Sequence, residues 1–298
     1  MEFPEFLSRF TDCKFTLNEK LSKYGGYKTG GRAKFFITPL SVKSLSETVN
    51  YCAENKIKYA IIGKATNVLF SDKGFDGAIV KTDGIKGISL SGETVAAFCG
   101  EPLAAVCAFA EKHGLSGLEK FSGIPGSVGG AAVMNAGAFG GNVSNVIECV
   151  SALKDGKTIK YSKSECKFSY RKSRFINSDE IVASVVLKLK KCDRAEIENK
   201  TALYAEKRRL SQPSGRSCGS VFCNPQKTYA AKLIESANLK GFKVGGAKIS
   251  DVHANFIIAE NGATSSDVYN IIKTVKERIK NEYGIILKEE IKYIGEFT

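Results

Sequence analysis

The sequence predicts a mixed α/β (α+β) protein of about two domains, and three observations support this prediction. The chain has 298 residues, which is enough for about two hydrophobic cores. An apolar strand at 33–38, a helix at 42–52 and a second apolar strand at 58–62 give a strand–helix–strand order. Composition changes near residue 192, where strand-like segments give way to a polar helix. We therefore expect a domain boundary close to that residue.

Local patterns predict the elements of the first half. Residues 1–23 mix short apolar and polar segments and are expected to form a helical lead-in. Ser44 and Glu47 resemble a capping box for the helix at 42–52. The elements expected next are strands at 77–82 and 94–99 and a helix that begins at Pro102 and stops at Gly114.

The middle of the chain is predicted to be sheet. Two strand candidates, 146–153 and 157–161, are joined by Asp155-Gly156, which is a strong hairpin signal. A third candidate at 181–189 alternates apolar residues with neighbours that become polar only towards its end. Such a strand is expected to be buried for much of its length.

The last third is predicted to mix helices and strands. A polar helix at 193–210 has Asp193 as its candidate N-cap and basic residues near its end, which suits the helix dipole. The elements expected after it are a helix at 230–240 ended by Gly241, a strand at 253–258, a helix at 267–282 and a strand at 285–294 that carries Glu289 and Glu290.

Composition restricts the class of protein. Hydrophobic residues make up 43% of the chain and charged residues 25%, as in ordinary globular proteins. The first residues lack the basic and apolar regions of a signal peptide, and no apolar run is long enough to cross a bilayer. Nine scattered cysteines and only two histidines argue against disulfides and against a metal site. We expect a cytoplasmic protein with reduced thiols, no metal, no membrane association and no obligate protein partner.

The net charge of +13 raises the alternative of nucleic-acid binding. Lysines supply most of this charge, and they are spread along the chain rather than gathered on one helix or in one block. No RNP-like aromatic motif, zinc finger or basic helix is present. A lysine-rich surface that attracts small anions is the simpler interpretation.

The most unusual stretch is the glycine-dense run 119–142, with its core at 123–130. Glycines packed this closely indicate a backbone that something approaches, because a single turn needs only one or two. Successive N–H groups in such a run can hold an anion, and a following helix can add its positive end. The pattern is not that of the dinucleotide fold, since Pro125 interrupts it. The sequence therefore predicts a diphosphate cradle, with a mobile lid or tightly packed structural turns as alternatives.

Six motifs in order resemble the UDP-N-acetylenolpyruvoylglucosamine reductase (MurB) family over nearly the whole chain. They are Thr29-Gly30-Gly31-Arg32-Ala33; 63–70; Phe168-Ser169-Tyr170-Arg171-Lys172-Ser173-Arg174-Phe175; Gly219-Ser220-Val221-Phe222-Cys223-Asn224-Pro225; Gly245-Gly246-Ala247 with His253-Ala254-Asn255-Phe256; and 287–295, and the glycine-rich run 117–141 carries the same resemblance. The short interval from Arg171 to Ser220 leaves little room for the tyrosine-bearing loop of one branch. The chain therefore resembles the loop-lacking type II branch.

The resemblance implies a particular domain organisation. After an N-terminal lead-in at 1–22, an FAD-binding domain of the PCMH/vanillyl-alcohol-oxidase type is expected at 23–192. Its two lobes are expected at about 23–82 and 83–192. A C-terminal α+β substrate-binding domain is expected at 193–298, with its last strand carrying Glu290.

The resemblance also implies a reaction. NADPH reduces a tightly but non-covalently held FAD, and the reduced flavin passes hydride to the enolpyruvyl group of UDP-N-acetylglucosamine enolpyruvate. The product is UDP-N-acetylmuramate, a peptidoglycan precursor. Hydride delivery to the β-carbon places negative charge on the α-carbon and its carboxylate, so the site must stabilise that charge and supply a proton.

By resemblance, three residues serve this need. Arg171 would polarise the carboxylate, Ser220 would protonate the α-carbon, and Glu290 would steady the enolic intermediate. Read without the family, Arg171 suits a surface ion pair, Ser220 a turn hydroxyl, and Glu290 a salt bridge to Lys292. Glu289 would face the other side of a regular strand, so Glu290 is preferred.

The resemblance further assigns binding residues. Contacts to FAD are expected from Gly63, Lys64, Ala65, Thr66, Asn67, Gly123, Ile124, Pro125, Gly126, Ser127, Gly129, Gly130, Asn135, Ala136 and Gly137. Contacts to the UDP-sugar are expected from Arg209, Asn224 and His253. Cys223 stands where family members usually carry a basic residue, so Arg216 or Lys227 could take over a phosphate contact.

Two other functions remain open at this point. One is another flavoprotein of the same superfamily, such as an oxidase, in which Arg171, Ser220 and Glu290 have other uses. The other is a basic, non-catalytic nucleic-acid-binding protein. A purified protein with the visible absorbance of a flavin would exclude the second.

Overall fold

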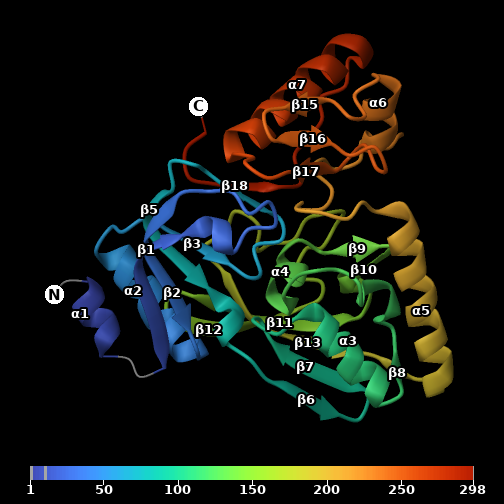
Figure 1. Ribbon diagram of the computed structural model, residues 1–298. Helices are drawn as coiled ribbons and strands as arrows, with labels where there is room; N and C mark the ends of the chain where they lie inside the picture. Colours follow the sequence, from blue (N-terminus) through green and yellow to red (C-terminus); the bar gives the residue numbers. More distant parts are fainter. Residues whose placement is uncertain (1–2, 10–11, 298) are drawn as a thin grey trace. The chain divides into compact units, whose positions relative to one another are not determined.

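A computed structural model describes residues 3–9 and 12–297 of the chain, in two compact units (Figure 1). Unit 1 comprises Met1–Thr16, Phe35–Lys64 and Gly77–Arg208. Unit 2 comprises Leu17–Lys34, Ala65–Asp76 and Arg209–Thr298. Both units are therefore assembled from segments that are distant in the sequence. The domain limits expected at residues 22 and 192 stay a prediction.

The N-terminal elements form a four-stranded sheet in the order β1-β2-β5-β3. In chain order the elements are α1 (Phe3–Ser8), β1 (Cys13–Lys20), β2 (Arg32–Pro39), α2 (Val42–Glu54), β3 (Tyr59–Ile62) and β5 (Phe75–Lys81). The predicted strand–helix–strand order of β2, α2 and β3 is confirmed. Strands β3 and β5 pair in parallel, with Ala60 opposite Ile79.

Two N-terminal predictions are wrong in detail. The helical lead-in holds for α1 and for the 3-10 helix Leu21–Lys23, but β1 between them is a strand whose Cys13, Phe15 and Leu17 alternate with polar residues. The capping box of α2 begins one turn earlier than predicted. Ser41 is the N-cap, and its side chain accepts the backbone N–H of Ser44 at 3.0 Å.

Unit 1 contains an antiparallel five-stranded sheet in the order β12-β11-β13-β7-β6. Its strands are β6 (Ile88–Ser91), β7 (Thr94–Phe98), β11 (Ile147–Lys154), β12 (Lys157–Ser162) and β13 (Ile181–Lys188). The hairpin predicted at Asp155-Gly156 is confirmed, since both residues have positive φ, 47° and 73°. The buried strand predicted near 181–189 is β13.

Helices α3 (Leu103–Lys112) and α4 (Val128–Val133) lie on one face of this sheet (Figure 1). Val106 of α3 and Val128 of α4 share a buried cluster with Val150 and Val185 of the sheet. Short strand pairs extend the unit: β8 (Leu115–Ser116) with β14 (Lys190–Lys191), and β9 (Gly137–Ala138) with β10 (Gly141–Asn142). The glycine-rich run, which includes α4, therefore packs on the sheet and on α3.

Helix α5 (Arg194–Ser211) is largely polar and exposed, and Ile197 is its one buried residue among those described. The predicted N-cap is confirmed. The Asp193 carboxylate accepts the backbone N–H of Ala195 at 2.9 Å and that of Glu196 at 3.3 Å. The helix extends unit 1 as far as Arg208.

Unit 2 is built on the antiparallel sheet β15-β16-β17, with α7 packed against β15 and β16 (Figure 1). Its elements are β4 (Val68–Phe70), α6 (Ala230–Ser236), β15 (Lys243–Val244), β16 (Ala247–Ile249), β17 (Ile257–Ala259), α7 (Ser265–Tyr283) and β18 (Lys292–Ile294). Strand β18 pairs in parallel with β4, which comes from the first third of the chain. Helix α7 ends at Gly284, whose φ is +67°.

Three C-terminal elements are shorter than predicted. Helix α6 ends at Ser236, four residues before the expected end at 240. Residues 253–256 form a turn closed by the Phe256 N–H to His253 carbonyl bond of 3.0 Å, so only β17 remains of the strand expected at 253–258. Of the strand expected at 285–294, only β18 is regular, because the preceding residues pair through a single bridge at Glu289.

Candidate functional site

The glycine-rich run forms a tight loop, then helix α4, then the β9–β10 hairpin. The loop is tied to the start of α3 on both sides: Leu103 N–H donates to the Gly126 carbonyl at 3.0 Å, and Val128 N–H donates to the Glu101 carbonyl at 2.8 Å. Ser127 caps α4, its hydroxyl accepting the Gly130 N–H at 3.2 Å. The run is therefore a fixed backbone structure rather than a lid.

The structure brings two of the predicted cofactor loops together in unit 1. A side chain at Gly63 would collide with the Ser127 hydroxyl, so glycine is what lets the end of β3 lie against the cap of α4. Gly123, Pro125 and Gly130 are exposed along the same run. Gly63 therefore makes room for the Ser127 hydroxyl, and the exposed backbone at Gly123, Pro125 and Gly130 is the part of the run that would hold the diphosphate of FAD.

A basic side chain lies against this run. A Cβ at Gly123 would be 2.8 Å from the Nε atom of Arg208, whose guanidinium lies 5.7 Å above the Phe139 ring. Partial burial lowers the pKa of Arg208 from its ordinary value. Sequence reasoning selected the next residue, Arg209, which is exposed and belongs to unit 2. On a helix one residue changes the direction of a side chain by about 100°, so the sequence alone could not separate the two arginines.

Arg171 lies in a turn closed by reciprocal backbone bonds between Ser169 and Lys172, of 3.0 and 3.1 Å. Its φ of +53° is uncommon for a residue with a side chain and costs on the order of 1 kcal/mol. The Nη2 atom donates to the Gly137 carbonyl at 3.2 Å. Arg171 is thus placed against the hairpin that ends the glycine-rich run, inside unit 1.

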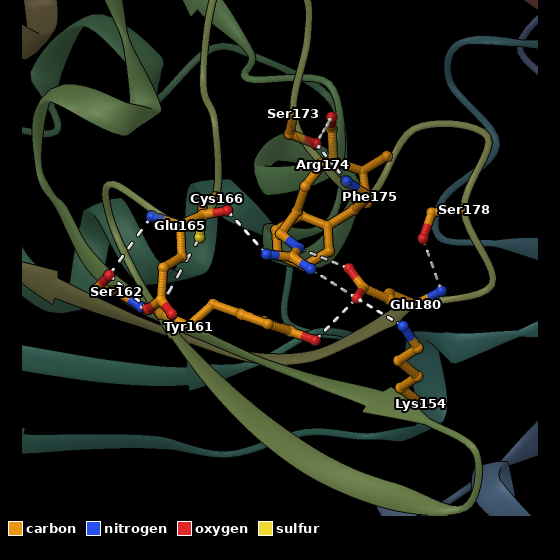
Figure 2. A network of polar contacts seen from close by, with 11 residues as sticks. Lys154, Tyr161, Ser162, Glu165, Cys166, Ser173, Arg174, Phe175, Ser178 and Glu180 are labelled. Carbon is orange, nitrogen blue, oxygen red and sulfur yellow. Dashed lines mark hydrogen bonds and ion pairs between the residues drawn. The ribbon is translucent and has the colours of Figure 1, made fainter.

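A buried ion pair fixes the segment that follows Arg171 (Figure 2). Arg174 donates twice to the Glu180 carboxylate, at 2.7 and 2.8 Å, and the Tyr161 hydroxyl donates to the same group at 2.8 Å. The Glu180 side chain is 4% exposed, and Lys154 lies 3.7 Å away. The hydrogen bond from Arg174 holds the pKa of Glu180 below its ordinary value, against the opposing effect of burial. The 174–180 segment is therefore anchored to strands β11 and β12.

In unit 2, Asn255 holds the segment that carries Ser220. Its side chain is buried, accepts the Phe222 N–H at 2.9 Å and donates to the Phe222 carbonyl at 2.8 Å. Its own carbonyl accepts the Val221 N–H at 2.8 Å. Ser220 itself bridges to Phe256. Asn255 belongs to a recognised motif, but sequence reasoning gave it no role.

Glu290 lies beside the Ser220 segment. Its backbone N–H donates to the Val221 carbonyl at 2.8 Å, and its carbonyl accepts the Asn67 side-chain amide at 3.0 Å. Glu289 instead pairs with Lys276 through a 2.6 Å contact. The structure therefore brings Ser220, Glu290 and Asn67 into one neighbourhood of unit 2, and it gives Glu289 a separate partner.

Four more residues that the sequence analysis named have a defined local geometry. Asn224 accepts the Ala230 N–H at 3.0 Å, next to the start of α6. The Nδ1 atom of His253 accepts the Asn255 N–H at 3.2 Å, and partial burial lowers the histidine's pKa. Ala65 has a φ of +52° in the turn between β3 and β4. Cys223 donates its backbone N–H to the Lys288 carbonyl at 2.9 Å.

Two further types of feature are absent from residues 3–9 and 12–297. No helix there is both long and apolar enough to cross a bilayer. Nor does any cluster of three or more histidine, cysteine, aspartate or glutamate side chains suit a metal ion.

Comparison with known proteins first identifies the class of protein to which the chain belongs. Residues 33–162 match the family model of the FAD binding domain, and residues 211–294 match that of the UDP-N-acetylenolpyruvoylglucosamine reductase C-terminal domain. The predicted fold class is confirmed as a mixed α+β protein with an FAD-binding domain and a C-terminal α+β domain. The fold and the glycine-rich loops define an FAD-dependent oxidoreductase.

Relatives then identify the family. Reductases of this name from Caldicellulosiruptor bescii and Listeria innocua are both 38% identical, covering 100% and 97% of this chain and 96% and 98% of their own. The crystal structure of UDP-N-acetylenolpyruvylglucosamine reductase (MurB) from Thermus caldophilus matches with a TM-score of 0.81 at 31% identity, covering 96% of this chain and 100% of that one. The chain belongs to the UDP-N-acetylenolpyruvoylglucosamine reductase family, as its motifs predicted.

Proposed function

We propose that this protein reduces UDP-N-acetylglucosamine enolpyruvate to UDP-N-acetylmuramate with NADPH, as a cytoplasmic enzyme of peptidoglycan precursor synthesis. The observation that supports this most is the match to reductases of that name over 92–100% of the chain, at 38–40% identity. The six motifs of the sequence fall within these matches. Bound FAD would supply the redox chemistry by which a hydride moves from NADPH to the β-carbon of the enolpyruvyl group.

Residues of unit 1 would hold the cofactor and polarise the substrate. The exposed positions Gly123, Pro125 and Gly130 of the glycine-rich run, near Gly63, would hold the diphosphate of FAD. Arg171 offers a planar fork of donors to the substrate carboxylate, where charge accumulates as hydride arrives. The guanidinium already donates to the Gly137 carbonyl, so it is held in place before the substrate binds.

Residues of unit 2 would supply the proton. Ser220 donates its hydroxyl proton to the α-carbon, and the resulting alkoxide regains a proton from solvent. A serine hydroxyl is an ordinary weak acid, but the carbanionic intermediate is a strong enough base to take its proton. Glu290, whose backbone is tied to Val221, lies close to Ser220 and steadies the enolic intermediate. Asn224 and His253 would bind the UDP-sugar, as would Arg209 or its neighbour Arg208.

The chain fits the branch that lacks the tyrosine loop. Strand β13, strand β14 and helix α5 account for most of the interval between Arg171 and Ser220. This leaves no long insertion in which a substrate-binding tyrosine could lie. The substrate would therefore be enclosed by other residues in this protein.

The test is to follow the flavin spectrum of the purified holoenzyme. NADPH should bleach the visible absorbance under anaerobic conditions, and the enolpyruvyl substrate should restore it with formation of UDP-N-acetylmuramate. A control with UDP-N-acetylglucosamine, which lacks the enolpyruvyl group, should leave the flavin reduced. Reoxidation by oxygen at a rate comparable to that with the enolpyruvyl substrate would favour an oxidase of the same superfamily.

A further inference from the structure

Asn135 follows helix α4 with a buried side chain, 2% exposed, and a φ of +42°. Both ends of its amide are engaged by the protein. The Nδ2 atom donates to the Ser169 carbonyl at 2.8 Å, and the Oδ1 atom accepts the Ser144 N–H at 3.2 Å. One side chain therefore connects the glycine-rich segment to the turn that carries Arg171.

The Arg171 turn has a second attachment on the same hairpin. The guanidinium donates to the Gly137 carbonyl at 3.2 Å, two residues beyond Asn135. A Cβ at Gly137 would lie 3.0 Å from the Nη1 atom and 2.6 Å from the Gly141 carbonyl. Glycine at 137 thus admits the guanidinium, while Asn135 holds the backbone from which it extends.

We propose that Asn135 is a positioning residue for Arg171, and that its amide serves the protein rather than the cofactor. This inference rests on the proposed function, in which Arg171 polarises the substrate carboxylate. A free arginine side chain has several rotatable bonds, and ordering it when the substrate binds costs conformational entropy. Fixing its backbone at Ser169 and its tip at Gly137 removes most of that cost before substrate binds. A loss of position of about 1 Å can slow a reaction on the order of 100-fold.

Two substitutions separate the contacts that Asn135 makes. Asn135→Asp keeps an acceptor for the Ser144 N–H and tolerates the left-handed backbone, but it cannot donate to Ser169. Asn135→Gly removes both contacts without backbone strain. Thr48→Val is the matched control, because Thr48 is fully buried in α2 and donates to the Ser44 carbonyl at 2.7 Å.

The kinetic test uses the FAD-loaded full chain and measures the two half-reactions separately. Both Asn135 variants should reduce FAD with NADPH within about 2-fold of wild type, but oxidise it with the enolpyruvyl substrate about 10- to 100-fold more slowly. In an Arg171→Ala background, Asn135→Asp should add less than about a 2-fold loss, because the group it positions is gone. Equal loss in both half-reactions, or the same loss with Arg171 absent, would overturn the proposal.

A second readout does not depend on activity. Hydrogen exchange of the Lys172 and Arg174 amides, which donate to Ser169 and Cys166, should accelerate in Asn135→Asp but not in Thr48→Val. Unchanged exchange would mean that Asn135 does not hold the turn. If wild-type enzyme failed to act on the enolpyruvyl substrate, the proposed function would fall, and the exchange measurement would still decide whether Asn135 positions Arg171.

Discussion

The segments that carry Ser220 and Glu290 are joined through the backbone, because the Glu290 N–H donates to the carbonyl of Val221. Asn255 holds the other edge of the same segment with bonds to Val221 and Phe222. The segments that carry Ser220 and Glu290 therefore depend on Asn255, to which the sequence assigned no role. In the proposal above, Arg171 depends in the same way on Asn135, which the sequence had assigned to FAD. An asparagine side chain that bonds to backbone N–H and carbonyl groups leaves no periodic pattern in the sequence. Its role is therefore visible only once its partners in the structure are known.

Ser220→Ala should separate the two half-reactions. Reduction of FAD by NADPH should be unchanged, since the serine only supplies a proton to the second step. Oxidation of the reduced flavin by substrate should slow by about 100-fold or more. Stopped-flow absorbance measures both rates, and Ser214→Ala, at an exposed position of the same segment, is the control. Normal overall turnover of Ser220→Ala would refute the acid role.

The neighbouring glutamates provide a matched pair of variants. Glu290→Gln should spare flavin reduction and slow the second half-reaction by about 100-fold. Glu289→Gln should keep near-wild-type rates, because it loses only a partly exposed pair with Lys276 that contributes about 0–1 kcal/mol to stability. Steady-state and single-turnover assays of both proteins make the comparison. Equal losses would show that the catalytic glutamate is misassigned.

At the scale of elements, the segment 171–180 connects a strained turn to the five-stranded sheet. The buried pair of Arg174 and Glu180 is its anchor, with Tyr161 and Lys154 around the carboxylate (Figure 2). Ser173 adds a 2.6 Å bond to the Val133 carbonyl at the end of α4. The segment is therefore held to the sheet on one side and to the glycine-rich run on the other.

Removing the Glu180 charge should change how stability depends on pH. The pKa of Glu180 is lowered in the folded protein, so its ionisation stabilises the fold above its unfolded pKa of about 4.3, and this is lost as the pH falls through the folded value. Glu180→Gln should cost about 3 kcal/mol at pH 7, because it leaves Arg174 partly buried without its partner, and less in acid.

Urea unfolding of wild type and Glu180→Gln from pH 7 to pH 3 measures this difference. Glu198→Gln is the control, because its pair with Arg194 is exposed and should contribute less than about 0.5 kcal/mol. A wild-type advantage that stayed constant over the whole pH range would contradict a role for the Glu180 charge.

Elements with a strong local signal were predictable, and those defined by distant partners were not. The β11–β12 hairpin, the Asp193 cap and the apolar strand β13 were evident because neighbouring residues specify them. Strand β1 is mostly exposed and was missed because its apolar alternation stops at Leu17, before the polar residues 18–20. The segment before β18 appeared to be one long strand, but it meets its partners at isolated points near Phe222 and Asn67. Only the three-dimensional structure supplies such partners.

For the whole molecule, the proposed contact of the glycine-rich run with the diphosphate predicts that this part of FAD contributes most to the ligand's stabilisation of the fold. The FAD-free protein should unfold at a lower temperature than the holoenzyme, and added FAD at about 100 times its dissociation constant should contribute about 2.7 kcal/mol. Riboflavin, which lacks phosphate, should raise the melting temperature far less, whereas ADP should produce part of the shift of FAD. Thermal unfolding at equal ligand concentrations measures this. A riboflavin shift as large as that of FAD would mean that the backbone run does not bind the diphosphate.

Unit 2 draws its core from three separated stretches of the chain. Tyr27 and Leu69 pack in the same buried cluster as Val268 and Ile291, and β4 pairs with β18. During synthesis on the ribosome, the two early stretches must therefore wait for partners that emerge last. A gene fragment that begins at Arg209 would lack part of its own core and one strand of a pair. Attempts to produce the C-terminal region alone should yield insoluble material unless residues 17–34 and 65–76 are supplied with it.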